Sequence, residues 1–435
     1  MASAPIRDPQ IECLPRAEIE QLQLERLQAT VNRAYRNVAF YQKRFEDLSL
    51  TPEDFQRIDD LARLPLTGKD DLRAGYPYGM FAVPLREVVR VHLSSGTTGN
   101  PSVVGYTAND VRHLADLVAR NLAAAGVTKD DVVQIFFGYG IFTAGFGFHY
   151  GTEALGASVI PFSHGDTRRQ VQVMRDFRTT VIIGTAHYAL SIVAAAEEMG
   201  VDPHALSLRV GLFGGEPWEE SVRETIQQRL MIEAYDVYGL AELGGPGVSF
   251  ECERHDGLHV SEDQFYVEVV DPATGERLGP GEQGELVFTT LNKEAFPLLR
   301  YRSGDLSSVN PEPCACGRTH ARMGRVSRHA DDRVVVRGVS IFPRQVEAAL
   351  GSIEGLSPRF QMVVDRTTLL ERLEIHVQLA PGMIPDQMRR LVEMEARVRE
   401  KLQELLGLSV DIKLGAYGSI AEETPRIRII AGEGQ

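Results

Sequence analysis

The stretch GASVIPFSHGDTRRQVQVMRDFRTTVIIGT, residues 156–185, decides the fold class of this chain. It starts with a short apolar run, GASVIPFS, continues with RRQVQVMRDF, whose pattern is typical of a helix, and ends in a second apolar run, TTVIIGT. Short apolar runs separated by a helical stretch are the pattern of strands that lie parallel in one sheet. The stretch therefore predicts a largely parallel sheet covered by helices.

The same alternation extends in both directions along the chain. The run DVVQIFF (131–137) precedes the stretch, and LRVGLFGGEP (208–217) follows it. Further upstream, residues 15–46 have apolar positions that recur at intervals of three and four, which predicts an N-terminal helical cap. We therefore expect an α/β core that begins after this cap.

Two changes of pattern predict further units. In QFYVEVVDPATGERLGPGEQGELVFTTL (264–291), β-rich runs alternate with turn dipeptides, which indicates an antiparallel β subdomain. From about residue 329 onwards, strand and helix patterns alternate over roughly a hundred residues, which indicates a small α+β domain. We predict a large N-terminal domain over 1–328 and a small C-terminal domain over 329–435.

Composition excludes several classes of protein. The 435 residues are 43% hydrophobic and 24% charged, as in ordinary soluble globular proteins, and the net charge of -14 disfavours indiscriminate nucleic-acid binding. The start, MASAPIRDPQIECLPR, lacks the pattern of a signal peptide, and no run of about 18 apolar residues could span a membrane. We expect a cytoplasmic protein that contacts neither membrane nor nucleic acid.

The glycine-rich segment SSGTTGNP (94–101) follows the strand-like VVRVHL. Its glycines allow the backbone to turn successive amides toward one point, and its hydroxyl groups add further donors, which together suit phosphate oxygens. The spacing differs from the GxxxxGK[ST] phosphate loop, and a flexible surface loop is the alternative interpretation. The candidate phosphate-binding residues are Ser94, Ser95, Gly96, Thr97, Thr98 and Gly99.

Four motifs in this order give the chain a family resemblance: SSGTTG, GGEP (214–217), YGLAE (238–242) and YRSGD (301–305). Their order and spacing resemble those of the adenylate-forming (AMP-binding) enzymes, which include acyl-CoA synthetases and peptide-synthetase adenylation domains. Within that superfamily the chain looks most similar to phenylacetate-CoA ligases and related aryl-CoA ligases. This closer likeness rests on FGYGIFTAGFGFHYG, YGLAELGGPGV, PCACGRTHARM and GVSIFPRQVE.

The resemblance implies the adenylate-forming fold, in which a small mobile C-terminal domain follows the large one, and often a homodimer. It implies an AMP-forming ligase that activates a carboxylic acid with ATP and transfers the acyl group to CoA. Two alternatives stay open. One is adenylation followed by transfer to an amine or a carrier-protein thiol. The other is a protein that binds nucleotide and an aromatic acid with little turnover.

The resemblance also assigns nucleotide-binding roles. Glu242 is implied as the catalytic magnesium ligand, and Asp305 as the acceptor of two hydrogen bonds from the ribose hydroxyls. Taken alone, each carboxylate has a simpler interpretation, since Glu242 could be a solvated residue opening a helix and Asp305 a turn residue. The other implied ATP- or AMP-binding residues are Gly215, Glu216, Pro217, Asp236, Tyr238, Gly239 and Arg325.

The acid is expected to bind beside the adenylate. Aromatic side chains among glycines in FFGYGIFTAGFG suit a flat ring, so we expect an aromatic or heteroaromatic acid, although core packing is the commoner role of such residues. The residues that the family position implies for this pocket are Phe137, Tyr139, Phe142, Gly214 and Pro246.

Three basic positions depart from the family pattern. Where relatives have Gly-Arg before the Asp-Asp of the hinge, this chain has Arg328-His329, and the hinge aspartate is Asp331. Arg426 replaces the near-terminal lysine that bridges carboxylate and phosphate during adenylation, and Asn100 stands where the phosphate loop often has a lysine. Arginine keeps the charge but changes its reach, so Arg426 is a candidate catalytic cation, with Arg428 as a further candidate.

The cysteines suggest a structural metal site. Cys252 and His259 lie in CERHDGLH, and Cys314 and Cys316 form a CxC pair. Three thiolates and one imidazole suit tetrahedral Zn²⁺, although this is not a standard CxxC spacing. Rival fourth ligands are His255 and His320. The alternative is that these are unliganded small residues in turns.

Overall fold

The computed structural model describes residues 6–94, 100–326, 328–329, 334–336, 339–367, 371–381, 388–406, 408–421 and 423–430. It contains two compact units: unit 1 is Met1–Thr185 with Ala195–Ala330, and unit 2 is Asp331–Gln435 with Ala186–Ala194. Each unit is described by itself. The boundary after residue 328 remains a prediction. The phosphate-loop candidates Ser95, Gly96, Thr97, Thr98 and Gly99 and the hinge residue Asp331 lie outside the described residues.

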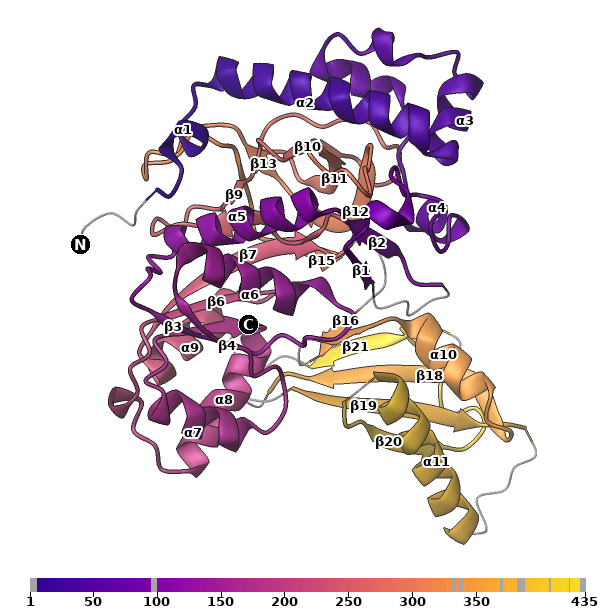
Figure 1. Cartoon of the computed structure of the whole chain (residues 1–435). Coiled ribbons are helices and arrows are strands. Elements are labelled where there is room, and N and C mark those ends of the chain that lie inside the picture. The colour runs from indigo at the N-terminus through magenta and orange to yellow at the C-terminus, as the bar shows by residue number, and fades with distance from the viewer. Residues whose placement is uncertain are drawn as a thin grey trace. The chain divides into compact units, whose positions relative to one another are not determined.

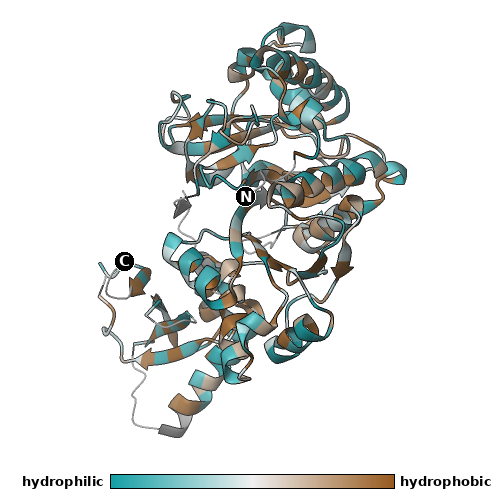
Figure 2. Cartoon of the chain, turned by 90° about the vertical axis from the view of Figure 1, so that its left-hand side faces the viewer, coloured by the Kyte–Doolittle hydropathy of each residue, from teal (hydrophilic) through white to brown (hydrophobic). Residues whose placement is uncertain are grey.

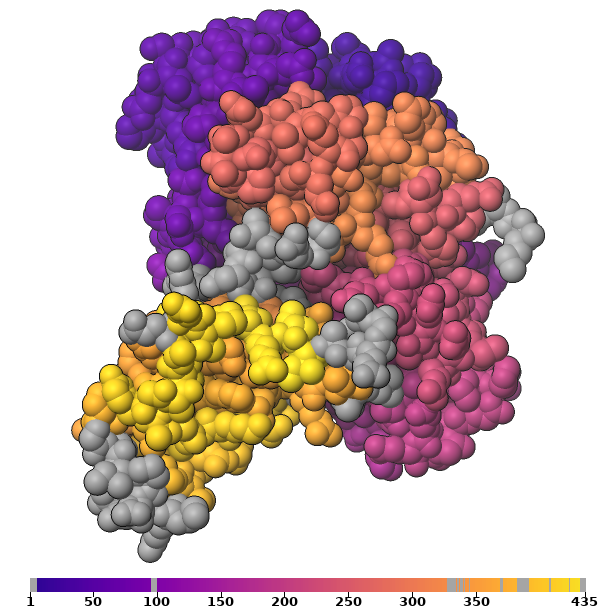
Figure 3. All heavy atoms as spheres, turned by 180° about the vertical axis from the view of Figure 1, so that it is seen from behind, coloured from indigo at the N-terminus to yellow at the C-terminus, as the bar shows by residue number. Residues whose placement is uncertain are grey.

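Unit 1 begins with helices that cover the β subdomain. The segment predicted as a helical cap forms two helices, because Val38 adopts an extended conformation (φ -117°, ψ 106°) that ends α2 and begins α3. Gln23 Nε2 of α2 donates a hydrogen bond to the carbonyl of Glu262 at 3.0 Å, and Thr30 Oγ1 donates one to the carbonyl of Leu291 at 3.0 Å. Figure 1 shows these N-terminal helices beside the strands of the β subdomain, and Figure 3 shows the indigo and purple atoms of the N-terminal region next to the coral and orange atoms of that subdomain. The N-terminal helices are α1 (Pro9–Glu12), α2 (Arg16–Asn37), α3 (Ala39–Asp47), α4 (Lys69–Ala74) and the 3₁₀ helices Pro52–Asp54, Ile58–Arg63 and Leu85–Glu87.

The central sheet of unit 1 has the strand order β13-β14-β9-β8-β7-β6-β5-β3-β4. Its half from β4 to β7 is parallel, which confirms the prediction made from residues 156–185. The two strands within residues 156–185, β4 and β5, are not direct neighbours, because β3 lies between them and pairs with both. The strands are β3 (Val132–Ile135), β4 (Ser158–Ile160), β5 (Val181–Gly184), β6 (Val210–Gly214), β7 (Glu233–Leu240), β8 (Gly245–Glu251), β9 (Leu258–Val260), β13 (Val309–Asn310) and β14 (Arg322–Met323).

Helices alternate with the strands of this sheet, as a parallel arrangement requires. Figure 1 shows α5 and α6 together on one face of the sheet. Buried side chains of α5, among them Leu117 and Val118, pack toward the sheet, and a Cβ on Gly151 of α6 would lie 2.4 Å from Val118. The helices are α5 (Ala108–Ala124), α6 (Thr143–Leu155), α7 (Thr167–Asp176), α8 (Ala186–Glu198), α9 (Glu220–Leu230) and the 3₁₀ helix Pro203–Ala205.

A second sheet of unit 1, with the order β10-β11-β12-β15, is antiparallel, as the turn-rich sequence predicted. Residues of β12 alternate between buried and half-buried, which is the period of a strand with one face on a core. A separate antiparallel hairpin flanks the glycine-rich loop. These strands are β1 (Arg90–Leu93), β2 (Val103–Tyr106), β10 (Phe265–Val270), β11 (Gly284–Thr290), β12 (Tyr301–Ser307) and β15 (Arg328–His329).

Unit 2 is an α+β unit with its own core. Its main sheet has the order β20-β19-β18-β21, in which β18 and β19 are antiparallel and the outer pairs are parallel. Val346, Leu350, Ile375 and Leu402 are each 0% exposed in this core. The elements are β16 (Val334–Val336), β17 (Val339–Ile341), α10 (Pro343–Gly351), β18 (Leu356–Asp365), β19 (Arg372–Leu379), α11 (Met388–Leu406), β20 (Asp411–Gly415) and β21 (Ile427–Ile430).

Hydropathy follows this architecture. Figure 2 shows hydrophobic residues concentrated along the strands, whereas the helices carry both hydrophobic and hydrophilic residues. This is the distribution expected when sheets are buried and helices present one face to water. Among the described residues, no helix combines the length and the hydropathy that a membrane crossing requires.

Candidate functional site

The centre of the candidate site is the edge where β6 and β7 end. These strands are parallel neighbours, so their carboxyl ends meet at one edge of the sheet. Gly214 ends β6, and a Cβ there would lie 2.0 Å from the carbonyl oxygen of Val237. Gly215 follows with φ +78°. Position 214 therefore needs glycine because the neighbouring strand leaves no room for a side chain, and position 215 favours glycine because its backbone is left-handed.

Tyr238 and Asp305 connect the two sheets at this edge. Tyr238 lies in β7, Asp305 lies in β12, and the Tyr238 hydroxyl donates a hydrogen bond to Asp305 Oδ2 at 2.7 Å. Asp305 is 2% exposed and its backbone amide donates to Ser303 Oγ at 3.0 Å. The carboxylate is thus held in one orientation, which suits the ribose-binding role that the resemblance implied.

Asp236 and Arg325 form a second fixed pair. Arg325 Nε donates to Asp236 Oδ2 at 3.1 Å, and its Nη1 donates to Glu220 Oε2 at 2.8 Å. The guanidinium also lies 4.5 Å from the ring centroid of Trp218. Burial, followed by the charge of Glu251, raises the pKa of Asp236 to about 6, although Arg325 opposes this rise.

Motif reasoning missed Glu251, Arg223 and Trp218, which stabilise this region. Arg223 donates from Nη1 and Nη2 to the two carboxylate oxygens of Glu251 at 2.9 and 2.8 Å. Burial favours the neutral acid, but hydrogen bonds from His255 and Arg223 outweigh it and lower the pKa of Glu251 to about 2. The single tryptophan directly after GGEP was the signal that could have identified Trp218.

Glu242 lies in the turn between β7 and β8. Its side chain is buried, with 7% of the residue exposed, yet no hydrogen bond or ion pair joins it to any residue within the described ranges. A carboxylate without a protein partner is open to a cation, and the role of Glu242 as a magnesium ligand remains a prediction.

Nearby residues have tightly constrained backbones. A Cβ on Gly239 would lie 2.2 Å from the carbonyl of Gly245, which requires glycine in YGLAE. Glu216 is 7% exposed beside this edge, and Pro217 follows it before α9. Two hydrogen bonds join Ser94 to Ser102. The Ser94 backbone amide donates to the Ser102 carbonyl, and Ser94 Oγ accepts from the Ser102 amide, both at 2.9 Å.

The predicted acid-pocket residues have different surroundings. Phe137 stacks on Phe148 with ring centroids 5.6 Å apart, and a Cβ on Gly215 would lie 3.5 Å from the Phe137 ring. Pro246 packs against α6, since a Cβ on Gly147 would lie 2.5 Å from it. The structure thus places Phe137 at the end of β6 and Pro246 against α6.

Tyr139 and Phe142 make other contacts. The Tyr139 ring packs edge-on against Phe146 and His149, and its hydroxyl lies 3.3 Å from His149 Nδ1. Phe142 directly precedes α6 and is 46% exposed. Within the described part of the chain, no ring contact joins either residue to Phe137, so their role in the acid pocket remains a prediction.

Arg426 of unit 2 has a carboxylate partner. Its Nη1 and Nη2 donate to the two oxygens of Glu347 at 2.6 and 2.9 Å, and its guanidinium lies 5.5 Å from the Phe360 ring centroid. Such a bidentate pair orients the planar group in a way that a lysine could not reproduce. Arg428 lies two residues further on in β21 and is exposed.

The candidate metal centre is assembled as predicted. One ligand atom from each of Cys252, His259, Cys314 and Cys316 lies within 4.8 Å of all the others, and all four residues are buried. The Sγ atoms of Cys252 and Cys314 are 3.9 Å apart, close to the about 3.8 Å expected between thiolates around tetrahedral zinc. Hydrogen bonds from Cys252 and His259 lower the pKa of the Cys316 thiol.

The two rival histidines have other partners. His255 Nδ1 lies 3.2 Å from Glu251 Oε2. His320 Nδ1 lies 3.1 Å from the Val260 carbonyl oxygen, and His320 Nε2 lies 3.1 Å from the Ile11 carbonyl oxygen. The structure therefore favours His259 as the fourth ligand, because its Nε2 lies 3.4 Å from Cys316 Sγ.

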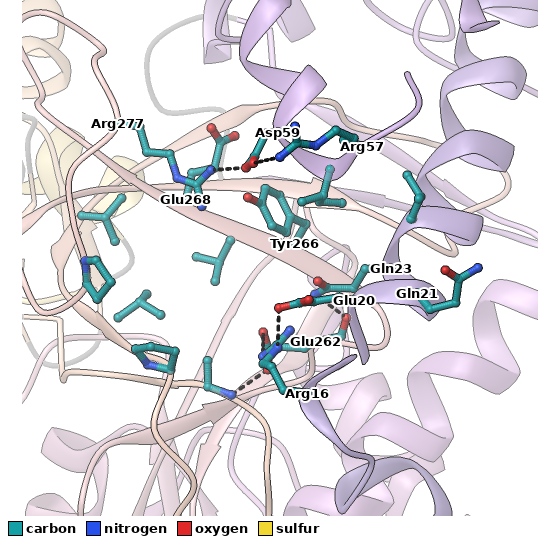
Figure 4. Close-up of a pocket in the computed structure, with 18 of the residues that line it drawn as sticks. Arg16, Glu20, Gln21, Gln23, Arg57, Asp59, Glu262, Tyr266, Glu268 and Arg277 are labelled. Carbon is teal, nitrogen blue, oxygen red and sulfur yellow. Dashed lines mark hydrogen bonds and ion pairs between the residues drawn. The ribbon is translucent and has the colours of Figure 1, made fainter. Parts of the chain in front are cut away.

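A cavity of about 600 Å³ lies away from these residues, between α2 and β10. Figure 4 shows Arg16 and Gln23 turned toward Glu262 at one end and Arg277, Asp59 and Tyr266 gathered at the other. Its charged groups are paired, since Arg16 lies 2.8 Å from Glu262 and Arg277 lies 2.8 Å from Asp59. These pairs join the N-terminal helices to the β subdomain.

Comparison with known proteins gives the class of the fold and site. Residues 24–292 match the model of the AMP-binding enzymes, and residues 338–431 match that of the AMP-binding enzyme C-terminal domain. The chain therefore belongs to the AMP-binding enzymes, and the predicted family and enzyme class are confirmed.

Closer relatives place it within that class. The chain is 46% identical to a phenylacetate-coenzyme A ligase of Pseudomonas putida, over 92% of this chain and 91% of the relative. It is 44% identical to the phenylacetate-coenzyme A ligase of Escherichia coli, over 95% of this chain and 94% of that protein. It belongs to the phenylacetate-CoA ligase family.

A solved structure supports the fold. A 2-hydroxyisobutyryl-CoA ligase, in complex with 2-HIB-AMP and CoA, matches with a TM-score of 0.91 and 28% identity, over 98% of this chain and 92% of the other. The predicted adenylate-forming fold is thus confirmed. An amide bond synthetase from Marinactinospora thermotolerans, at 14% identity and a TM-score of 0.55, shares the fold alone.

Proposed function

We propose that this protein activates an aromatic carboxylic acid with ATP to an acyl adenylate and then transfers the acyl group to CoA. The observation that carries the proposal is the identity of 44–46% with phenylacetate-coenzyme A ligases over more than nine-tenths of the chain. The solved 2-hydroxyisobutyryl-CoA ligase with 2-HIB-AMP and CoA adds support for both half-reactions.

In the first half-reaction, an oxygen of the acid attacks the α-phosphorus of ATP, and the bond to pyrophosphate breaks. Negative charge gathers on the phosphate oxygens in the transition state, so donors and cations around them accelerate the step. We assign the phosphates to residues 94–99 and the ribose to Asp305, whose orientation by Tyr238 supports this role. Gly215, Glu216, Pro217, Asp236, Gly239 and Arg325 complete the nucleotide site.

Glu242 is the proposed magnesium ligand. Its burial without a described partner supports this assignment. When bound, magnesium supplies positive charge at the phosphate oxygens. The chain's own contribution is a carboxylate held at the end of β7, on the edge of the sheet where the nucleotide residues gather.

The acid is proposed to lie against Phe137, Gly214 and Pro246, with Tyr139 and Phe142 at the entrance. A flat aromatic wall next to residues without bulky side chains favours a ring over a branched aliphatic acid. Arg426 is the proposed cation of the C-terminal unit, oriented by Glu347. Rotation of the C-terminal unit about the hinge at Asp331 would move this cation away from the nucleotide site before CoA binds.

The cluster of Cys252, His259, Cys314 and Cys316 is proposed to hold a structural zinc ion. The four donors leave no position for substrate, as is usual for structural sites. Arg318 Nη1 lies 3.7 Å from Cys316 Sγ and would offset the negative charge of a three-thiolate site. A homodimer and a cytoplasmic location complete the proposal.

Pyrophosphate release across a panel of aromatic acids tests this function. We expect phenylacetate to stimulate release, and CoA to convert the adenylate into a thioester identified by mass. An amine or carrier-protein adduct in place of the thioester would support the acceptor alternative. Thermal stabilisation by ATP and an acid without any pyrophosphate release would support a binding protein instead, and would contradict the ligase proposal.

A further inference from the structure

The turn that follows Glu242 is built from glycines in left-handed conformations. Gly244, Gly245 and Gly247 have φ values of +105°, +110° and +103°. Backbone hydrogen bonds define this turn, because the amides of Leu243 and Gly244 donate to the carbonyls of Leu240 and Ala241 at 3.1 and 3.0 Å, and β8 begins at Gly245. Side chains from other elements also pack against the turn that carries Glu242.

Three such side chains surround the turn. A Cβ on Gly245 would lie 2.9 Å from Thr143 Cβ, and one on Gly247 would lie 3.0 Å from Leu117 Cβ. On the remaining side, a Cβ on Gly244 would lie 3.1 Å from the Lys293 ammonium. Of these three side chains, that of Lys293 is the one that carries a charge.

Lys293 occupies an unusual place for a lysine. Its Nζ lies 3.4 Å from the ring centroid of Tyr106, whose side chain is 0% exposed. Within the described ranges no carboxylate forms an ion pair with this ammonium. Desolvation lowers the pKa of Lys293 to about 8, although the charge of Asp110 opposes the fall. A desolvated ammonium above an aromatic face is a cation–π contact, which is strongest where water is excluded.

Tyr106 also lies within electrostatic reach of Glu242. Burial is the main reason that the pKa of the Tyr106 phenol is raised, and the charge of Glu242 is among the further causes. Lys293 and Tyr106 therefore form a pair that contacts the turn at Gly244 and lies close to the carboxylate proposed to bind magnesium.

We propose that Lys293 is a positioning residue for Glu242: held on the face of Tyr106, its ammonium supports the Gly244–Gly247 turn and so orients the Glu242 carboxylate. The inference rests on the proposed function of Glu242. It explains why a half-buried lysine stands here instead of an apolar side chain. Lys293 acts through the turn and does not contact the substrate.

Lys293→Met tests the inference, because methionine keeps an unbranched apolar stem and removes the charge. We expect the magnesium concentration for half-maximal pyrophosphate release to rise by about tenfold, as for other outer partners of metal ligands. Pro246 lies in the same turn and is assigned to the acid pocket, so the KM for the acid is measured as well and should change by a smaller factor than the magnesium requirement. Lys293→Arg should recover part of the loss, because a guanidinium also binds an aromatic face. Lys129→Met, at an exposed position of unit 1, is the matched control.

A binding measurement separates this role from general packing. In the unmutated protein, adding magnesium to an ATP-saturated sample should raise the melting temperature further. In Lys293→Met, the further rise in melting temperature on adding magnesium should be smaller, whereas the rise caused by ATP alone should be unchanged. Lys293→Gln, which stays polar, provides the same comparison if the methionine variant does not fold.

An unchanged magnesium requirement in Lys293→Met would overturn the inference, whether or not the KM for the acid changes. The proposed function has its own control, which is pyrophosphate release by the unmutated protein. If no acid stimulates release, the ligase proposal fails, whereas the magnesium increment in melting temperature still decides the role of Lys293.

Discussion

Tyr238 and Asp305, which lie 67 residues apart, are joined by a hydrogen bond of 2.7 Å between the phenol hydroxyl and Oδ2. Tyr238 belongs to the central sheet and Asp305 to the antiparallel sheet, so the bond joins the two sheets of unit 1 at the carboxylate that is proposed to bind the ribose. The site is thus held by a contact between motifs, in addition to the conformation of each motif.

Tyr238→Phe should weaken ATP binding. The variant loses the donor that orients Asp305, and a hydrogen bond to a charged group contributes about 1.5–3 kcal/mol. We expect the KM for ATP in pyrophosphate release to rise about five- to tenfold, with a smaller change in the KM for the acid. Tyr78→Phe, at a position that is 47% exposed, is the control. An unchanged KM for ATP would mean that Asp305 does not need this bond.

Asp236→Asn should stabilise the protein at pH 8. The pKa of Asp236 is raised from 3.8 to about 6, so its ionised form opposes folding above pH 6, and this penalty shrinks as the pH falls from 6 and is lost below 3.8. The melting temperature of the variant should exceed that of the unmutated protein at pH 8, and the two should converge toward pH 4. ATP binding should weaken at the same time.

Glu251→Gln should have the opposite effect on stability. The pKa of Glu251 is lowered to about 2, so its ionised form stabilises the fold above the usual carboxyl pKa, and this contribution is lost as the pH falls toward 2. We expect a lower melting temperature at pH 7, with the difference narrowing in acid. A variant as stable as the unmutated protein at pH 7 would contradict the role of the Arg223–Glu251 pair.

Glu242→Gln should suppress magnesium-dependent adenylation and leave the fold intact. We expect pyrophosphate release to fall by at least about 100-fold, the upper end of the loss seen when outer partners of a metal ligand are removed. The melting temperature without nucleotide serves as the control for folding. Near-normal release would show that another group binds the ion.

Arg426→Lys should slow adenylation, even though lysine is the residue that the family resemblance implies at this position. One ammonium cannot reproduce the two parallel hydrogen bonds to Glu347, so the cation would lose its orientation. Rates of pyrophosphate release at saturating ATP and acid measure the effect, with Arg397→Lys on an exposed face of α11 as the control. A faster variant would mean that Arg426 limits the enzyme.

Much of the fold follows from local patterns. The alternation over residues 131–217 predicted the parallel sheet, because strand and helix periods are properties of short stretches. The proposed metal ligands also follow from residue type, because few residue types bind zinc and the chain has only four cysteines. Metal binding by this cluster remains a prediction. The helical cap was predicted too, although its division at Val38 was not.

Side-chain partners over long distances were not predictable. Nothing in the motifs indicated that Trp218 would lie against Arg325, or that Tyr139 would pack against His149 while Phe137 stacks on Phe148. Such contacts depend on which elements become neighbours and on the direction of each side chain. Neither property is contained in the spacing of residues along one segment.

The sequence by itself determined the class of the chain, its order of strands and helices, and the residue types of its nucleotide and metal sites. Only the tertiary structure decided which carboxylates are held by partners, as Asp305 is by Tyr238, and which lack one, as Glu242 does among the described residues. It also placed Lys293 against the turn at Gly244. The physical reason is that periodicity and turn chemistry act locally, whereas burial and charge pairing arise when distant segments pack together.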